Sequence, residues 1–230
     1  MQAVILAAGR GKRLRPLTDV TPKPLLKVAG KPILEHNLRQ LPSQVKEVIL
    51  VVNYLKEQIK SYFGKEFFGK KITYIEQEEM LGTAHALWAC KKYLKNEKFI
   101  AMNGDDFYYQ EDMARCLSYD HCILVKKLNN LGRFDLVKTD KQDFLKGFIK
   151  NHLTNSSGLV NIGFYVLSKN IFNYKMVSMA NGEFGLPQTI ISMTKDYPVK
   201  IIRANYWLPV GFPEDLKKAE KWLCDLTTNK

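Results

Sequence analysis

The chain has 230 residues, of which 46% are apolar and 25% are charged, and this composition excludes a wholly disordered or low-complexity protein. The formal net charge is +12. Such a charge attracts phosphate in nucleic acid, in membrane headgroups or in a small anionic substrate, but a solvated basic surface is an equal alternative. The motifs must decide between them. No apolar run reaches the roughly 18 residues of a membrane span, no signal peptide is predicted, and the four cysteines form no CxxC pair that would indicate zinc or a disulfide framework.

The chain alternates short apolar runs with helical patterns over its first half. Strands are predicted over 3–8, 47–52, 72–75 and 99–102, and helices over 32–41, 54–63 and 84–94. This alternation predicts an α/β fold with a Rossmann-like, mixed and mainly parallel sheet flanked by helices. Ligands bind beyond the carboxyl ends of such strands. We therefore expect the loops 9–23, 77–83 and 104–106 to form one neighbourhood.

The second half has a less regular pattern. Strands are predicted over 123–125, 134–137, 145–149, 159–167 and 199–202, and helices over 170–177, 186–193 and 214–226. Neither a Pro/Ser-rich linker nor an internal repeat separates the halves in the sequence. A single domain over 1–230 is therefore expected.

A polar loop rich in glycine and arginine follows the first predicted strand. Gly9 and Gly11 allow the backbone to approach a ligand closely and to present its N–H groups to phosphate oxygens. The loop gathers the cations that two small phosphate-bearing substrates would need, which are Arg10, Lys12, Arg13, Arg15 and, between two prolines, Lys23. The third glycine of a dinucleotide-binding GxGxxG motif and the GK[ST] of a P-loop are absent, and an ordinary basic connection is the alternative.

The complete spacing from Leu6 to Leu26 resembles the signature of the sugar-1-phosphate nucleotidylyltransferases, LAxGxGxRLxPLTxxxPKPLLP, with Lys27 in place of the final proline. The resemblance implies the nucleotide-diphospho-sugar transferase fold, with a nucleotide-binding half (1–110) and a sugar-binding half (111–230). It implies that Arg13 holds the β- and γ-phosphates of a nucleoside triphosphate. Lys23 would neutralise charge near the α-phosphate, and the backbone at Ala8, Gly9 and Gly11 would contact the nucleotide.

A second block, from Gln77 to Leu87, is similar to the family's Q-x(3–4)-LGTAxAL segment. The resemblance implies that the Gln77 amide binds a pyrimidine edge, that Gly82 lets the base lie against the backbone, and that Thr83 belongs to the nucleotide site. A plain turn with Thr83 as the helix cap is the alternative. His85 is expected to be a packed helix residue rather than an acid or base.

A third block, Asn103-Gly104-Asp105-Asp106, follows the fourth predicted strand. The resemblance implies that Asp105 binds Mg²⁺, a metal that prefers carboxylate and phosphate oxygens; Asp106 is a second candidate ligand, a supporting group or a cap. Pro209 stands where the family carries its second metal carboxylate. Either Asp105 and the triphosphate hold the metal largely alone, another group such as Asp106 substitutes, or activity is impaired.

Weaker matches in the second half suggest the sugar-phosphate side of the site. These candidates are Gly132, Lys150, Asn161 and Glu183, and for each a plain strand or turn residue is the alternative. The glutamate that the family uses on a sugar hydroxyl is replaced by Ile149.

Together these motifs predict a cytoplasmic, Mg²⁺-dependent enzyme. It would convert a nucleoside triphosphate, UTP or dTTP above others, and a sugar 1-phosphate to NDP-sugar and pyrophosphate for polysaccharide synthesis. The alternative is a weak or inactive homologue that binds nucleotide or NDP-sugar as a regulator. Neither nucleic acid nor a membrane is an expected partner, because the lysines are spread along the chain without a nucleic-acid motif. The sequence leaves the oligomeric state open.

Overall fold

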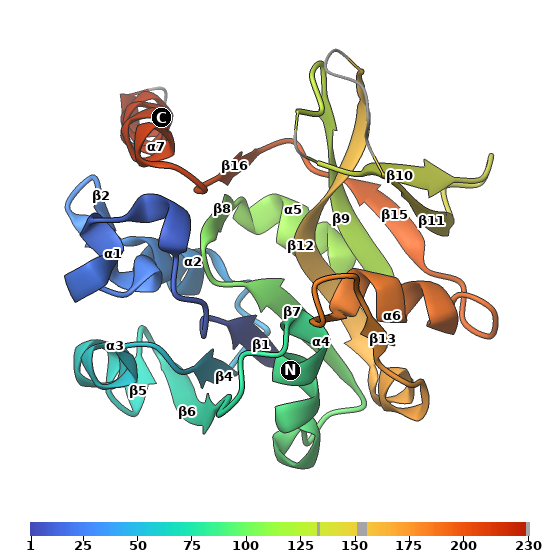
Figure 1. The fold of residues 1–230 in the computed structure, drawn as a ribbon, viewed down its shortest axis with the longest axis horizontal. Coiled ribbons are helices and arrows are strands. Elements are labelled where there is room, and N and C mark those ends of the chain that lie inside the picture. The colour runs from blue at the N-terminus through green and yellow to red at the C-terminus, as the bar shows by residue number, and fades with distance from the viewer. Residues whose placement is uncertain (133, 151–155, 229–230) are drawn as a thin grey trace.

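The computed structural model describes residues 1–132, 134–150 and 156–228, with side chains as far as residue 223. Its centre is a ten-stranded sheet whose main path runs β11-β10-β12-β7-β1-β4-β6-β5, with β9 alongside β12 and β15 alongside β9 (Figure 1). In the first half these strands are β1 (Gln2–Leu6), β4 (Glu47–Val52), β5 (Glu66–Phe67), β6 (Lys70–Glu76) and β7 (Lys98–Asn103). In the second half they are β9 (Cys122–Leu128), β10 (Leu136–Thr139), β11 (Leu145–Ile149), β12 (Gly158–Ser168) and β15 (Lys200–Arg203).

The strands β6, β4, β1 and β7 are neighbours and all run parallel. The strands β1, β4 and β7 are mostly apolar and buried on both faces because helices cover both sides of the sheet. Strand β6 also carries the exposed Lys71 and Glu76. The connections carry α2 (Ile33–Gln40), α3 (Lys56–Phe63) and α4 (Thr83–Ala89), the last followed by the 3₁₀ turn η3 (Lys91–Tyr93). The predicted α/β fold is confirmed. Because these four strands are parallel, their carboxyl ends lie together at one edge of the sheet.

The sheet continues from the first half into the second. Strand β12 pairs antiparallel with β7 on one side and with β9 on the other, so residues from both halves share one hydrogen-bonded layer. Helix α6 (Leu186–Met193) packs against α4 on one face of the sheet. Leu87 of α4 and Ile190 of α6 belong to the same buried apolar cluster.

Several parts of the second half differ from the predicted elements. The helix predicted over 170–177 is only the 3₁₀ turn η4 (Lys169–Asn173), after which β13 (Val177–Ser178) pairs with β14 (Phe184–Gly185). Helix α5 (Gln110–Cys116) was not predicted, because the charged Asp112 interrupts its apolar pattern. Asp112 is fully buried, and its carboxylate accepts hydrogen bonds from the backbone N–H groups of Asn205 and Tyr206.

A small apolar cluster fixes the polar loop that follows β1. The loop contains η1 (Lys12–Leu14), α1 (Leu17–Val20) and η2 (Lys23–Leu25), and leads into the hairpin of β2 (Lys27–Val28) and β3 (Lys31–Pro32). Buried Leu14 and Ile33 pack here with Phe107, Val210 and Ala219. They therefore join the loop to β8 (Asp106–Tyr108), its partner β16 (Trp207–Pro209) and helix α7 (Pro213–Thr228). In the described part of the chain no helix has the length and apolar character needed to span a membrane.

Candidate active site

Two adjoining cavities lie beyond the carboxyl ends of β1, β6 and β7. The larger, of about 540 Å³, is bounded by the loop after β1, the loop before α4 and the end of β7. The smaller, of about 220 Å³, lies between the loop after β1, Asp105 and Gly211. Gly9, Gly11, Lys12 and Asp105 line both. The three loops that the sequence predicts to be neighbours thus meet here.

The loop after β1 is held in a tight conformation around Gly11. This residue has φ +63°, and a Cβ there would lie 3.0 Å from Lys23 Cβ and 3.0 Å from Thr18 Cγ2. The buried Thr18 hydroxyl donates to the Gly11 carbonyl at 3.0 Å. A Cβ at Gly9 would meet no atom within 4 Å, so its backbone remains open to the cavity. Gly11 therefore serves internal packing, whereas Gly9 leaves room for a ligand.

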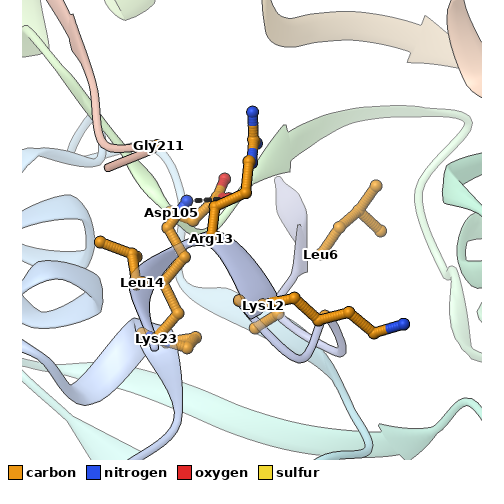
Figure 2. Close-up of a pocket in the computed structure, with 11 residues that line it drawn as sticks. Leu6, Lys12, Arg13, Leu14, Lys23, Asp105 and Gly211 are labelled. Atoms are coloured by element: carbon orange, nitrogen blue, oxygen red, sulfur yellow. Dashed lines mark hydrogen bonds and ion pairs between the residues drawn. The ribbon is translucent and has the colours of Figure 1, made fainter. Parts of the chain in front are cut away.

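Lys23 and Asp105 form the central ion pair of the site. The Lys23 ammonium lies 2.6 Å from Asp105 Oδ2, and the lysine is only 6% exposed while the Asp105 side chain is 39% exposed. Figure 2 shows the Lys23 side chain rising to the Asp105 carboxylate, with Arg13 extending past the pair. The pair brings a positive charge and a potential metal ligand to the floor of the smaller cavity.

The other cations of the loop divide into two groups. Arg10 and Lys12 are exposed and line the larger cavity, and the exposed Arg13 lines the smaller one, with its guanidinium 5.3 Å from the centroid of the Phe212 ring. Arg15 lines neither cavity and instead pairs with Asp19 at 3.0 Å. The assignment of Arg15 to the phosphate cluster stays a prediction, because its exposed side chain is engaged here with Asp19 of α1.

Asp106 lies beneath this pair and is engaged in structural hydrogen bonds. Its Oδ2 accepts from Trp207 Nε1 at 3.2 Å, and its Oδ1 accepts from the Val210 N–H at 3.2 Å. Burial, together with the neighbouring charge of Asp105, raises the pKa of Asp106 to about 7. Pro209 is paired with Asp106 across the β8–β16 ladder. Among the residues with described side chains, no three His, Cys, Asp or Glu groups are placed to hold a metal together.

One wall of the larger cavity is built from Gln77, Gly82, Thr83 and Glu183. Gly82 has φ +96°, and a Cβ there would lie 2.6 Å from the Phe184 carbonyl oxygen and 2.8 Å from the Phe184 nitrogen. The N-cap of α4 is Gly82, so the alternative that Thr83 is the cap is wrong. The Thr83 hydroxyl instead accepts from the Leu186 N–H at 3.0 Å. Glu183, a predicted site residue, lines this wall, whereas Phe184, whose backbone lies against Gly82, is not a predicted site residue.

The other sugar-side candidates line neither of the two cavities. Asn161 donates to the Tyr165 hydroxyl at 2.7 Å and accepts from the Gly163 N–H at 3.1 Å. Lys150, at the end of β11, and Gly132 are exposed and line neither cavity. In this conformation the structure unites Glu183 with the predicted nucleotide residues but does not bring Gly132, Lys150 and Asn161 to them.

A family model and several known proteins that match this chain agree on one family. The family model described as "Nucleotidyl transferase" matches residues 2–225. "Bifunctional protein GlmU" of Methanocaldococcus jannaschii is 37% identical over 98% of this chain and 55% of its own length. The Campylobacter jejuni D-glycero-alpha-D-manno-heptose 1-phosphate guanylyltransferase is 35% identical over 94% of this chain and 96% of its own. The Haloferax volcanii UTP–glucose-1-phosphate uridylyltransferase AglF is 34% identical over 99% of this chain and 98% of its own. The chain thus spans about half the length of the GlmU relatives and nearly all of the other two.

The packing at Gly82 predicts a specific loss of stability in Gly82→Ala. Gly182 is the matched control, because it also has a positive φ (+81°) but its Cβ would meet no atom within 4 Å. Both variants strain the backbone, whereas only Gly82→Ala forces a methyl group into the Phe184 backbone. We expect it to lose about 1–3 kcal/mol more unfolding free energy than Gly182→Ala in urea titrations. Equal losses would contradict the close approach.

The raised pKa of Asp106 predicts a pH dependence of stability. Its folded pKa of about 7 exceeds the ordinary value of 3.8, so between these values the folded chain binds the extra proton. The contribution of Asp106 to the unfolding free energy is therefore full at low pH and is lost as pH rises toward 7. Asp106→Asn removes it. The difference between wild-type and variant unfolding free energies should shift with this sign in urea titrations across that range, and parallel profiles would refute the assignment.

Proposed function

Since the chain belongs to the nucleotidyl transferase family, we propose that it transfers a nucleotidyl group from a nucleoside triphosphate to a sugar 1-phosphate and releases pyrophosphate. One observation carries the proposal. The glycine-containing loop, the Lys23–Asp105 pair and the Gln77 side chain face two cavities that adjoin, so a triphosphate and a base have places on one continuous surface. The relatives from Campylobacter jejuni and Haloferax volcanii, which match over nearly their full length, carry names of this reaction class.

The reaction needs little besides orientation and charge neutralisation. A phosphate oxygen of the sugar 1-phosphate attacks the α-phosphorus in line. The bond from the α-phosphorus to the oxygen that bridges to the β-phosphorus breaks, and that oxygen leaves with pyrophosphate. The nucleophile is already an anion, so a general base is unnecessary. Lys23 would stabilise charge at the α-phosphate, and Arg13 and Lys12 would hold the departing phosphates.

The donor set at Asp105 fits Mg²⁺. This metal is commonly held by one or two carboxylates together with substrate phosphates, and the partly exposed Asp105 carboxylate faces both cavities. When bound with the triphosphate, Mg²⁺ would supply charge neutralisation of the phosphates. Asp106 is a poor second ligand because both of its oxygens already accept hydrogen bonds. We therefore favour a site in which Asp105 is the single protein carboxylate.

The base preference centres on Gln77. UTP and dTTP are our first candidates, because uracil and thymine offer a ring N–H between two keto groups. Guanine also has a ring N–H beside a keto group, and one relative is named a guanylyltransferase. The proposal therefore includes GTP among the triphosphates to be tested, which widens the preference drawn from the sequence. The sugar remains open, since Ile149 replaces the family's glutamate.

The competing proposal is a regulatory homologue that binds nucleotide or NDP-sugar without turnover. Pro209 is the observation that favours it, because a proline side chain offers no metal ligand. The intact Lys23–Asp105 pair favours the enzyme. The expected cytoplasmic location and role in polysaccharide synthesis stay predictions.

A substrate panel tests the proposal directly. UTP, dTTP, GTP, CTP and ATP are each combined with Mg²⁺ and a set of sugar 1-phosphates. Released pyrophosphate is measured and the NDP-sugar is identified by mass spectrometry. We expect turnover with at least one pair. Binding of nucleotide without turnover for any pair would favour the regulatory protein.

Within the active pair, Lys23→Met should lower kcat/KM by about a hundredfold or more, because a buried cation at the transferred phosphate is lost. Lys27→Met is the matched control, since Lys27 is exposed on β2 and lines neither cavity. It should retain wild-type turnover. Equal effects of the two substitutions would remove Lys23 from the proposed role.

The single-carboxylate site makes a prediction at Pro209. Pro209→Asp offers a second carboxylate from β16, next to the Asp105–Asp106 segment across the ladder. We expect the Mg²⁺ concentration for half-maximal turnover to fall several-fold in this variant, because a second carboxylate strengthens metal binding. Pro209→Ala controls for loss of the proline ring and should leave that concentration unchanged. The same Mg²⁺ requirement in all three proteins would show that position 209 is remote from the metal.

A further inference from the structure

Arg13 is held at the smaller cavity by an aromatic ring. Its side chain is exposed and lines that cavity together with Lys23. Lys23 is paired with Asp105 at 2.6 Å, whereas Arg13 forms no ion pair with a carboxylate among the described side chains. The Arg13 guanidinium carbon lies instead 5.3 Å from the centroid of the Phe212 ring.

A contact with a ring differs chemically from a contact with a carboxylate. The π electrons of an aromatic ring attract a guanidinium group without neutralising its charge. The N–H donors in the plane of the guanidinium stay available to another acceptor, and they match the oxygens of a phosphate group. Arg13 is therefore restrained by Phe212 and still able to bind an anion in the cavity.

Phe212 itself is fixed by the first turn of α7. It directly precedes Pro213, the first residue of the helix. The N–H groups of Gly211 and Phe212 donate to Asp215 Oδ2, at 2.9 Å and 3.0 Å. The Asp215 N–H donates in return to the Phe212 carbonyl at 3.0 Å. This reciprocal pattern is similar to a capping box, and it fixes the backbone from which the ring projects.

The backbones that carry the two side chains are anchored in one apolar cluster. Leu14, the neighbour of Arg13, is 1% exposed and belongs to the same cluster as Val210. Val210 stands two residues before Phe212, and its N–H donates to Asp106 Oδ1 at 3.2 Å. The contact between Arg13 and Phe212 is thus supported on both sides by buried packing.

We propose that Phe212 is a positioning residue, which holds the Arg13 guanidinium at the smaller cavity so that it binds the pyrophosphate part of the substrate. This rests on the proposed function, because it assumes that Arg13 contacts the departing phosphates. It goes beyond that function by giving a role to Phe212 and to the Asp215 cap that fixes it.

The physical basis is the ordering of a long side chain. An exposed arginine loses rotamer freedom when a ligand immobilises it, and this loss opposes binding. A ring that already restrains the guanidinium removes part of the loss, which strengthens binding by about two- to fivefold at a partly exposed position. Phe212 lines neither cavity, so we expect it to act on the ligand only through Arg13.

The experiment measures the dissociation constant of inorganic pyrophosphate, with Mg²⁺, by calorimetry. This probe needs neither a base nor a sugar. Phe212→Leu keeps an apolar side chain and removes the ring, and it should weaken pyrophosphate binding by about two- to fivefold. Phe212→Tyr and Phe212→Trp should keep the wild-type affinity, because both rings attract a cation. Urea titrations check that each variant folds, and Phe212→Met replaces Phe212→Leu if that variant does not.

Arg13→Met distinguishes positioning from a general effect on the fold. Alone it should weaken pyrophosphate binding by about tenfold or more, because hydrogen bonds from a charged group are lost. When Arg13→Met is already present, adding Phe212→Leu should weaken binding no further, because the ring has no guanidinium to hold. A ring with a merely structural role would weaken binding by the same factor in both backgrounds.

Phe68→Leu controls for the loss of a similar contact elsewhere. The Arg39 guanidinium carbon lies 4.5 Å from the centroid of the Phe68 ring, and Phe68 lines neither cavity. This variant should bind pyrophosphate as the wild-type chain does.

The outcomes distinguish the role of Phe212 from the proposed function. Absence of both turnover in the substrate panel and pyrophosphate binding would overturn the two together. Turnover without pyrophosphate binding would overturn the role of Phe212 alone. So would wild-type affinity in Phe212→Leu, or an equal loss with and without Arg13→Met, and the proposed function would then stand.

Discussion

The ion pair between Lys23 and Asp105 is the interaction on which the arrangement of the site depends. It joins the loop after β1 to the end of β7, two segments that are neighbours only because β1 and β7 are paired in the sheet. The loop can reach Asp105 because Gly11 lacks a Cβ, which would otherwise press against Lys23. A nearly buried ammonium group needs a partner, and the partly exposed carboxylate supplies one without being removed from the cavity. One contact thus brings a positive charge and a carboxylate together at the wall of the smaller cavity.

A second interaction brings the C-terminal segment to the same place. Asp106 receives hydrogen bonds from Trp207 and Val210, and this holds β16 against β8 and places Gly211 on the wall of the smaller cavity. The carboxylate next to Asp105 is therefore part of the scaffold. Its engagement explains how adjacent aspartates can differ in role, since Asp105 faces the cavity and Asp106 faces the protein.

The sequence was sufficient for the parallel core and for the loops that meet at its edge. A continuous apolar run such as 47–52 is typical of a strand in a sheet that is covered on both faces. In a parallel sheet the carboxyl ends of such strands lie together, which locates the loops of the site. It was insufficient where a polar residue is buried by a distant partner. Helix α5 was missed because Asp112 is buried by the backbone N–H groups of Asn205 and Tyr206, which lie 93 and 94 residues further along the chain. The 3.2 Å contact between Gln77 Nε2 and His85 Nδ1 has a weak signal in the sequence, namely two polar residues eight positions apart that flank a glycine turn.

The site residues differ in whether their polar groups are already hydrogen-bonded within the protein. Groups that are bonded hold the fold together, and groups that are not bonded can bind a ligand. Thr83, Asn161 and Asp106 were all candidates for ligand contact, yet each is hydrogen-bonded within the protein. Gln77 Oε1 and the exposed carboxylate of Glu183 accept no such bond in the described part of the chain, and both residues line the larger cavity. A ligand gains most where it pairs groups that folding leaves open, because it then displaces only water. Gln77 Oε1 and the Glu183 carboxylate are therefore the polar groups of this wall that a ligand could pair without breaking a bond of the fold.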